Sequence, residues 1–330
     1  MSGAIASSLD VNTVRTVGFP LHALTREEKQ RELLKLLRYD YTKVIRRDAI
    51  QQRMHGNSLC WNYHPHSWSV RCGDMRTPME VFGEENLLHD ALEHRKSMGK
   101  CSSPSDLRKA LSIYSGTQTV SNFSPLGAAA LYDRYLPLEG GTIYDPCAGW
   151  GGRLLGSLAC RKVKKYVATE PSALTFDGLC AMRDELPPMV KRLGRRVPEI
   201  DLHQEGSELP KPWLEKGSIQ MSIMSSPYYD HEQYSHEETQ SFIKFRTPEA
   251  WLDGFLGATL SNCHHALTET GCLAVNIAGV PSYPHLTEHL FWIAGRCGFR
   301  PVETLRLMLS AMPSVRGAFK CEPVFIFQKG

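Results

Sequence analysis

Three short stretches of this sequence combine residue types that could bind a ligand and act on it. In residues 144–153, YDPCAGWGGR, an acid and a proline follow an apolar run, and three glycines then fall within four positions. Glycines lack a Cβ atom and therefore let a ligand approach the backbone closely. Glu170 ends the next apolar run, where its carboxylate could accept hydrogen bonds from two hydroxyl groups. Ser225 begins the third stretch, SSPYYD, whose hydroxyl and carbonyl oxygens could accept hydrogen bonds from a ligand.

The elements around these stretches predict a sheet that brings them together. From Gly141 onward, apolar runs alternate with amphipathic segments, which is typical of a mostly parallel α/β sheet. Strands are predicted at residues 141–145, 165–169, 199–203, 219–224 and 271–277, with an antiparallel edge hairpin at 303–309 and 322–328. Helices are predicted at residues 126–135, 151–160, 172–185, 248–267 and 284–297. Ligands of such sheets bind beyond the carboxyl ends of the strands, where Asp145, Glu170 and Ser225 stand.

Two of these stretches resemble motifs of a known enzyme family. Residues 145–152 resemble the Asp-Pro-Phe-Ala-Gly-Ser-Gly-Thr turn of S-adenosylmethionine-dependent methyltransferases that act on exocyclic amino groups of DNA bases. Residues 226–229, Ser-Pro-Tyr-Tyr, resemble their catalytic Ser-Pro-Pro-Tyr or Asp-Pro-Pro-Tyr tetrapeptide. The resemblance, phage and bacterial in style, covers residues 121–330 and implies a Rossmann-like class I methyltransferase fold with a mostly parallel seven-stranded sheet. A mainly helical region, residues 1–120, would precede it, and S-adenosyl-L-methionine is the implied cofactor.

The resemblance implies cofactor-binding roles at Phe123, Asp145, Cys147, Gly149, Gly151, Glu170, Pro171 and Ser225. Asp145 would accept from the ammonium of the methionine moiety, and Glu170 from the two ribose hydroxyls. Gly149 and Gly151 would give the closest backbone approach. Phe123 would lie against the methionine end, although a role in stapling the following helix to the sheet stays open.

The resemblance also implies which groups act on the methyl acceptor. Ser226 and the carbonyl of Pro227 would accept from the amino hydrogens and so favour the pyramidal nitrogen of the transition state. Tyr229 would stack on the target base, but Tyr228 stands where a second proline is usual, so both rings remain candidates. Residues 225–230 contain no cysteine, so we expect one in-line displacement without a covalent enzyme intermediate. The target base would be flipped out of a duplex or presented in single-stranded DNA.

The resemblance implies a site-specific DNA methyltransferase that modifies an amino group. Serine at position 226 favours cytosine N4 over adenine N6, because adenine-specific members more often carry Asp or Asn there. Two alternatives stay open: a methyltransferase of RNA, protein or a small-molecule amine, and a non-catalytic nucleic-acid-binding module. Little chain remains beyond the predicted sheet, so target recognition would either lie in residues 1–120 or be loose. A restriction-modification role in bacteria or phage follows from the same resemblance.

Residues 1–120 match no family motif and are interpreted from local patterns. Residues 1–17 predict a loose arm. Thr25 and Glu28 form a capping box before a leucine-rich helix at residues 26–38. Further helices are predicted at residues 84–98 and 103–113.

A group of cysteines and histidines in this region raises the question of a metal. Zinc takes such ligands, and the candidates are Cys60, His64, His66 and Cys72. Their spacing differs from the usual short pairs, and three aromatic residues lie among them. We therefore predict an aromatic cluster without a metal, and stacking of these rings on a displaced base is the alternative.

Composition limits the class of protein. Of the 330 residues, 42% are hydrophobic and 22% charged, and the net charge of +3 is too small to indicate a polyanionic partner by itself. No apolar run approaches the roughly 20 residues of a membrane span, and the first residues lack the pattern of a signal peptide. The ten cysteines show no regular framework and are typical of reduced thiols. We expect a cytoplasmic protein of a bacterial cell or phage-infected host, without a membrane partner; the oligomeric state stays open.

Overall fold

The computed structural model describes residues 10–99, 103–311 and 319–330, without the side chains of residues 310, 311 and 319. The chain divides into two compact units. The smaller unit comprises Met1–Ala23, Pro65–Ser121 and Glu232–Ser235, and the larger unit comprises Leu24–His64, Asn122–His231 and His236–Gly330. One segment of the smaller unit ends at Ser121, and residues 24–64, which lie in the expected N-terminal region, belong to the larger unit.

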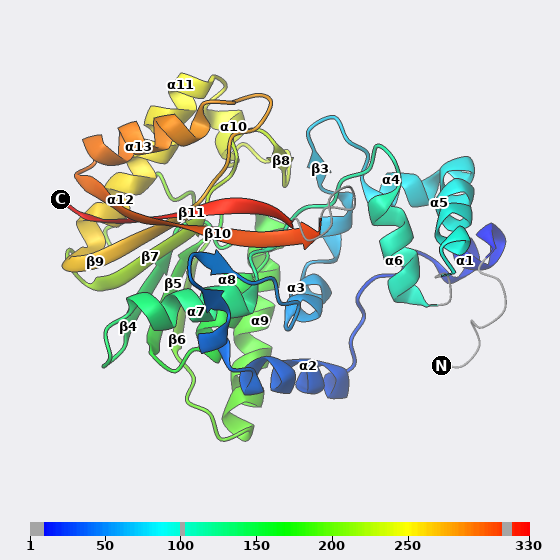
Figure 1. The fold of residues 1–330 in the computed structure, drawn as a ribbon, viewed down its shortest axis with the longest axis horizontal. Helices are drawn as coiled ribbons and strands as arrows, with labels where there is room; N and C mark the ends of the chain where they lie inside the picture. Colours follow the sequence, from blue (N-terminus) through cyan, green and yellow to red (C-terminus); the bar gives the residue numbers. More distant parts are fainter. Residues whose placement is uncertain (1–9, 100–102, 312–318) are drawn as a thin grey trace. The chain divides into compact units, whose positions relative to one another are not determined.

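A nine-stranded sheet runs through the larger unit (Figure 1). In spatial order its strands are β1 (Ile45–Arg46), β2 (Ala49–Ile50), β10 (Phe299–Ala311), β11 (Phe319–Lys329), β9 (Leu267–Asn276), β7 (Ile219–Ser225), β4 (Gly141–Asp145), β5 (Val163–Thr169) and β6 (Glu199–His203). The strands from β9 to β6 pair in parallel, whereas β11 is antiparallel to both β9 and β10. This order confirms the predicted Rossmann-like class I methyltransferase fold. The short strands β1 and β2 extend it beyond the seven expected strands.

Helices cover both faces of this sheet, as buried parallel strands require. One core cluster lies beneath α7 (Pro125–Tyr135), α8 (Gly152–Ala159) and α9 (Ala173–Arg192), and includes side chains of α2 (Arg26–Arg38) and α3 (Asn57–Tyr63). A second cluster lies on the other face, beneath the π-helical turn η3 (Leu252–Gly257), α12 (Ala258–Ala266) and α13 (Leu286–Arg296). In the described ranges, no helix combines the length and apolar character needed to cross a membrane.

Short polar signals fix where two of these helices begin. The Thr25 hydroxyl accepts from the Glu28 backbone N–H at 3.2 Å, and the Glu28 carboxylate accepts from the Thr25 N–H at 2.9 Å. Ser124 caps α7 by accepting from the Gly127 N–H at 3.3 Å, and Pro125 occupies the first helical position. The predicted capping box and the predicted start of α7 are both confirmed.

The smaller unit is mostly helical, with α1 (Val11–Val17), α4 (Pro78–Gly83), α5 (Glu85–Ser97) and α6 (Pro104–Ile113) around an apolar cluster of its own. It also contains a two-stranded sheet of β3 (Arg71–Cys72) and β8 (Glu232–Gln233). The helices predicted at 84–98 and 103–113 are confirmed as α5 and α6. The predicted loose arm is wrong for residues 11–17, because Asp10 caps α1 and Val14 is buried; residues 1–9 lie outside the described residues.

Two helices differ from their predicted extents. α9 continues through Pro187 and Pro188 to Arg192, although each proline removes an N–H donor from the helix. Met189 and Val190 follow the prolines and are buried, and this apolar burial offsets the lost hydrogen bonds. The single helix predicted at 248–267 is instead divided into α11 (Pro248–Trp251), η3 and α12.

We expect Gly156→Ala and Gly295→Ala, inside α8 and α13, to change stability in opposite directions. A Cβ at Gly156 would lie 2.6 Å from Ala128 Cβ and 2.8 Å from the Pro125 carbonyl oxygen, whereas a Cβ at Gly295 meets nothing within 4 Å. Overpacking by Gly156→Ala should lower the free energy of unfolding by roughly 1–3 kcal/mol. Gly295→Ala should raise it by roughly 0.5–1 kcal/mol, because alanine favours helix. Urea unfolding measures both changes, and equal effects would contradict the close packing of α7 on α8.

Candidate active site

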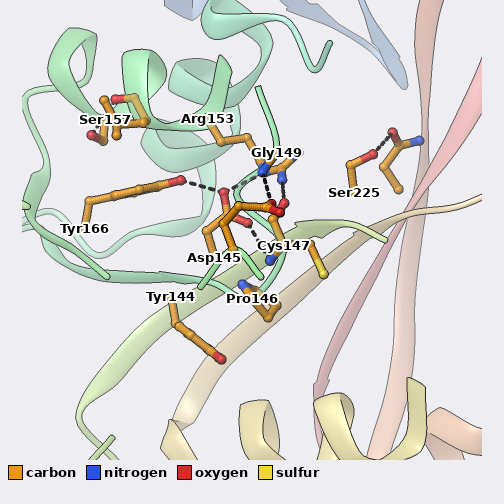
Figure 2. A network of polar contacts seen from close by, with 12 residues as sticks. Tyr144, Asp145, Pro146, Cys147, Gly149, Arg153, Ser157, Tyr166 and Ser225 are labelled. Carbon is orange, nitrogen blue, oxygen red and sulfur yellow. Dashed lines mark hydrogen bonds and ion pairs between the residues drawn. The ribbon is translucent and has the colours of Figure 1, made fainter. Parts of the chain in front are cut away.

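The turns that follow β4 and β7 stand at the same edge of the sheet. These strands are adjacent and parallel, with Tyr144 opposite Ser222, so Asp145 and Ser225 both occupy carboxyl ends. β5 pairs with the other side of β4 and ends directly before Glu170. Figure 2 shows Asp145 in its turn and Ser225 on the neighbouring strand. The predicted adjacency of the three chemical stretches is therefore confirmed.

Asp145 is fully buried and belongs to a polar network inside the larger unit (Figure 2). Its Oδ2 accepts from Arg153 Nε at 2.7 Å and from the Tyr166 hydroxyl at 2.6 Å, and its Oδ1 accepts from the Cys147 N–H at 3.2 Å. Both carboxylate oxygens are thus engaged by the chain itself. Contact with a methionine ammonium would have to share these oxygens or pass through water, and this role of Asp145 stays a prediction.

Arg153 closes this network from the first turn of α8. Its guanidinium also donates to the Cys147 carbonyl, and its own carbonyl accepts from the Tyr132 hydroxyl at 3.1 Å. Burial alone would lower the pKa of Arg153, but the Asp145 carboxylate raises it above its ordinary value. Burial, together with Asp145, also raises the pKa of Tyr166 well above its ordinary range. The network therefore combines the buried Asp145–Arg153 ion pair with a neutral phenol.

The glycine turn between Asp145 and Arg153 needs its glycines for two physical reasons. Gly149 and Gly151 have φ of +54° and +77°, a left-handed conformation that side chains disfavour. A Cβ at Gly152 would lie 2.0 Å from the Phe123 carbonyl oxygen, so this glycine lets α8 approach the segment before α7. Both constraints on the turn come from the protein itself and involve no ligand.

Glu170 connects the end of β5 to this turn. Its Oε2 accepts from the Gly149 N–H and its Oε1 from the Ser172 N–H, both at 3.0 Å. The side chain is buried, which raises the pKa of the carboxyl to about 7, although the two backbone donors oppose this shift. Each oxygen keeps a further lone pair with which it could accept from a hydroxyl. The position predicted for ribose binding thus holds a buried acid next to the glycine turn.

The third stretch begins with two serines that have different environments. Ser225 donates from Oγ to Asn276 Oδ1 at 3.2 Å. Ser226 is 3% exposed, its N–H donates to the Asn276 carbonyl at 3.3 Å, and its hydroxyl donates to the Pro227 carbonyl at 3.1 Å. The two predicted acceptors, the Ser226 hydroxyl and the Pro227 carbonyl, therefore lie together. Their roles toward an amine remain predictions.

The two tyrosines that follow differ in burial. Tyr229 has φ of +59° and is 8% exposed; its ring packs 6.0 Å from Trp251 and 6.0 Å from Tyr283, and its hydroxyl donates to the Arg246 carbonyl. Tyr228 is only partly buried, and its hydroxyl donates to Glu322 Oε2 at 2.8 Å. The stacking role first assigned to Tyr229 therefore fits Tyr228 better, because the Tyr229 ring is committed to the core.

The remaining predicted residues lie around the same turns. Phe123 is buried, and the Arg153 guanidinium lies 5.7 Å from the centre of its ring. Burial raises the pKa of the Cys147 thiol well above its ordinary value, which favours packing over nucleophilic chemistry. The Pro171 carbonyl accepts from the Thr239 hydroxyl at 3.4 Å. The cofactor roles of Phe123, Cys147 and Pro171 stay predictions.

The cysteine and histidine group is divided between the two units. Cys60 and His64 belong to the larger unit, where burial raises the pKa of the Cys60 thiol to about 12. The ring nitrogens of His64 face the carbonyls of Cys60 and Thr175, at 2.8 and 3.2 Å. Within the described ranges, no three His, Cys, Asp or Glu side chains are grouped as metal ligands.

Four residues of the site were not among the predicted ones: Arg153, Tyr166, Asn276 and Glu322. Arg153 directly follows the glycines, and a charged residue opening an otherwise apolar helix is a signal for a buried partner. Asn276 ends an apolar strand beside β7, so its place at the carboxyl edge of the sheet could also have been predicted. Tyr166 and Glu322 carry no comparable signal, because their partners are 21 and 94 residues away.

Comparisons with known proteins add no family assignment. No family model and no curated protein matches the chain. Among solved structures, a SAM-dependent methyltransferase from Methanosarcina mazei is 12% identical with a TM-score of 0.42, over 60% of this chain and 96% of that one. A TehB-like SAM-dependent methyltransferase from Corynebacterium glutamicum is 14% identical with a TM-score of 0.38, over 72% and 99% of the two chains. These likenesses are weak, and the fold assignment rests on the strand order described above.

We expect Arg153→Met to destabilise the protein strongly, because it leaves the Asp145 carboxylate buried without its cationic partner. The free energy of unfolding should fall by roughly 3–5 kcal/mol. The matched control is Arg306→Met, which breaks an ion pair with Asp48 whose two side chains are 54% and 53% exposed. That change should have little effect on stability, because exposed ion pairs contribute little to it. Equally small losses in urea unfolding would show that Asp145 does not depend on Arg153.

Proposed function

We propose that this chain is an S-adenosylmethionine-dependent methyltransferase whose acceptor is an exocyclic amino group of a DNA base, cytosine N4 before adenine N6. One observation carries the proposal. The glycine turn joined to Glu170 and the turn that holds Ser226 stand at the carboxyl ends of neighbouring strands in a class I methyltransferase sheet. A cofactor bound by the first turn would face an acceptor bound by the second.

The residues of the first turn fit the cofactor chemically. Glu170 offers a buried carboxylate with lone pairs for two ribose hydroxyls, and the left-handed Gly149 and Gly151 keep side chains out of the turn. Asn122 Nδ2 is buried beside Gly152 and has no hydrogen-bond acceptor among the described residues. The same amide lies near the Cys60 thiol, where it partly offsets the rise in pKa that burial causes. Such a donor suits the carboxylate of the methionine moiety. When bound, S-adenosylmethionine supplies an electrophilic methyl group.

The residues of the second turn would prepare the acceptor amine. The Ser226 hydroxyl and the Pro227 carbonyl would accept hydrogen bonds from the amino hydrogens, which withdraws the nitrogen lone pair from the ring as charge develops. Tyr228 offers the more accessible ring for stacking on the base. The proton lost from the amine passes to solvent, so the chain needs no dedicated general base.

A small-molecule or RNA amine is the second candidate. A net charge of +3 gives the chain little of the electrostatic attraction that proteins use to bind the phosphates of long DNA. Incubation with labelled cofactor and separate pools of unmethylated DNA, tRNA and metabolites distinguishes the acceptors. Mass spectrometry of the digested nucleosides then identifies the modified atom.

We expect Ser226→Ala to lower the rate of methyl transfer to unmethylated DNA by roughly 10- to 100-fold, because the amine loses one hydrogen-bond acceptor. Ser218→Ala is the matched control, since Ser218 lies before the opposite end of β7 and donates to the Glu215 carbonyl. This variant should retain the rate. Cofactor affinity, measured by calorimetry, should be the same in both variants. Full activity of Ser226→Ala would remove the serine from the proposed mechanism.

Cofactor affinity should increase as pH rises through about 7, because ionised Glu170 is the stronger acceptor for ribose hydroxyls. Stability of the free protein should change in the opposite sense. The folded-state pKa of Glu170 lies above its ordinary value of 4.5, so the folded chain binds more protons between pH 4.5 and 7. The free energy of unfolding therefore falls as pH rises through this window.

Glu170→Gln is the control for this pH dependence. The amide keeps the size of the side chain but cannot ionise, so both trends should flatten in the variant. Calorimetric titration with S-adenosylmethionine between pH 5.5 and 8.5, and urea unfolding at the same pH values, measure them. A wild-type affinity that is independent of pH would contradict the role given to Glu170.

A further inference from the structure

A polar cluster connects residues 225–230, here called the acceptor turn, to two further strands by hydrogen bonds. Tyr228 donates from its hydroxyl to Glu322 Oε2 at 2.8 Å, across 94 residues of sequence. Asn276, at the end of β9, donates from Nδ2 to the Pro323 carbonyl at 3.0 Å and lies 3.5 Å from the same Glu322 oxygen. Asn276 Oδ1 also accepts a hydrogen bond from the Ser225 hydroxyl. The strands β7, β9 and β11 therefore meet in side-chain hydrogen bonds directly beside Ser226.

The residues on either side of Tyr228 are anchored in the turn. The Ser226 N–H is fixed on the Asn276 carbonyl, and Tyr229, in its left-handed conformation, is fixed by its buried ring and by its bond to the Arg246 carbonyl. Tyr228 lies between these two anchored residues, and its side chain is only partly buried. The hydrogen bond to Glu322 holds the far end of this ring, which also packs against the second core cluster.

We propose that Glu322 is a positioning residue of the acceptor site, which holds the Tyr228 ring in the orientation that an incoming planar amine meets. This inference rests on the proposed function and deepens it. A carboxylate suits the task, because hydrogen bonds to an ionised acceptor are shorter and stronger than neutral ones. Asn276, at the end of β9, donates to this carboxylate. The orientation of the ring is therefore determined by strands of the sheet and not by the loop that carries Tyr228. Glu322 itself takes no part in methyl transfer.

The test is a double-mutant cycle in the full-length protein with Glu322→Ala, Tyr228→Phe and the combined variant. The probe is single-stranded unmethylated DNA with labelled S-adenosylmethionine. We expect each single variant to lower kcat/KM for DNA by roughly 10-fold, through loss of one charge-assisted hydrogen bond. The combined variant should be no worse than either single one, because both changes remove the same bond. Glu322→Gln, whose amide oxygen still accepts from the phenol, should recover most of the activity.

Glu303→Ala is the matched control for a merely structural effect. Glu303 accepts from the Tyr135 hydroxyl at 2.8 Å, in an equivalent bond on the neighbouring strand β10. This variant should keep kcat/KM and, like Glu322→Ala, should keep the cofactor affinity measured by calorimetry. Losses in the two single variants that multiply in the combined one would overturn the inference, as would a loss of cofactor affinity in Glu322→Ala. A wild-type protein that binds cofactor but methylates no DNA would instead refute the proposed function, and the inference with it.

Discussion

The buried ion pair between Asp145 and Arg153 is the interaction on which the rest of the site depends. A carboxylate without solvent is tolerated only when its oxygens are fully paired, and the chain supplies Arg153, Tyr166 and the Cys147 N–H for this purpose. These donors come from α8, β5 and the turn itself. The pair therefore fixes the angle at which the chain leaves β4 and enters α8, and with it the place of Gly149 against Glu170.

The two turns of the site are held by different physical means. The first turn is shaped from beneath by buried charges and by glycines whose backbone approaches its neighbours closely. The second turn is held from its sides, by Asn276 on one strand and by the core packing of Tyr229. An internal network of charges thus holds the first turn, and hydrogen bonds to neighbouring strands hold the second.

Much of this arrangement could be predicted from periodicity and turn chemistry, because those signals are local. The strands at 141–145 and 199–203 and the capping box at Thr25 are set by neighbouring residues and agree with the structure. Long-range contacts decided what could not be predicted. The burial of Tyr229 depends on Trp251 and Tyr283, and Asp145 is satisfied by Tyr166, which alternation alone presents as an ordinary strand residue. Likewise, α9 passes its prolines because buried residues lie beyond them.

The path of the chain between its two units limits how either unit could be exchanged between related proteins. Residues 24–64 contribute Leu33, Leu36 and Leu59 to the core of the larger unit. The four residues Glu232–Ser235, which follow β7 in the chain, belong to the smaller unit. A recombination event with a single crossover near residue 120 would therefore remove core side chains from the sheet domain and leave β8 without its partner strand β3. A viable chimera must be joined at several points, so the two units are expected to be inherited together.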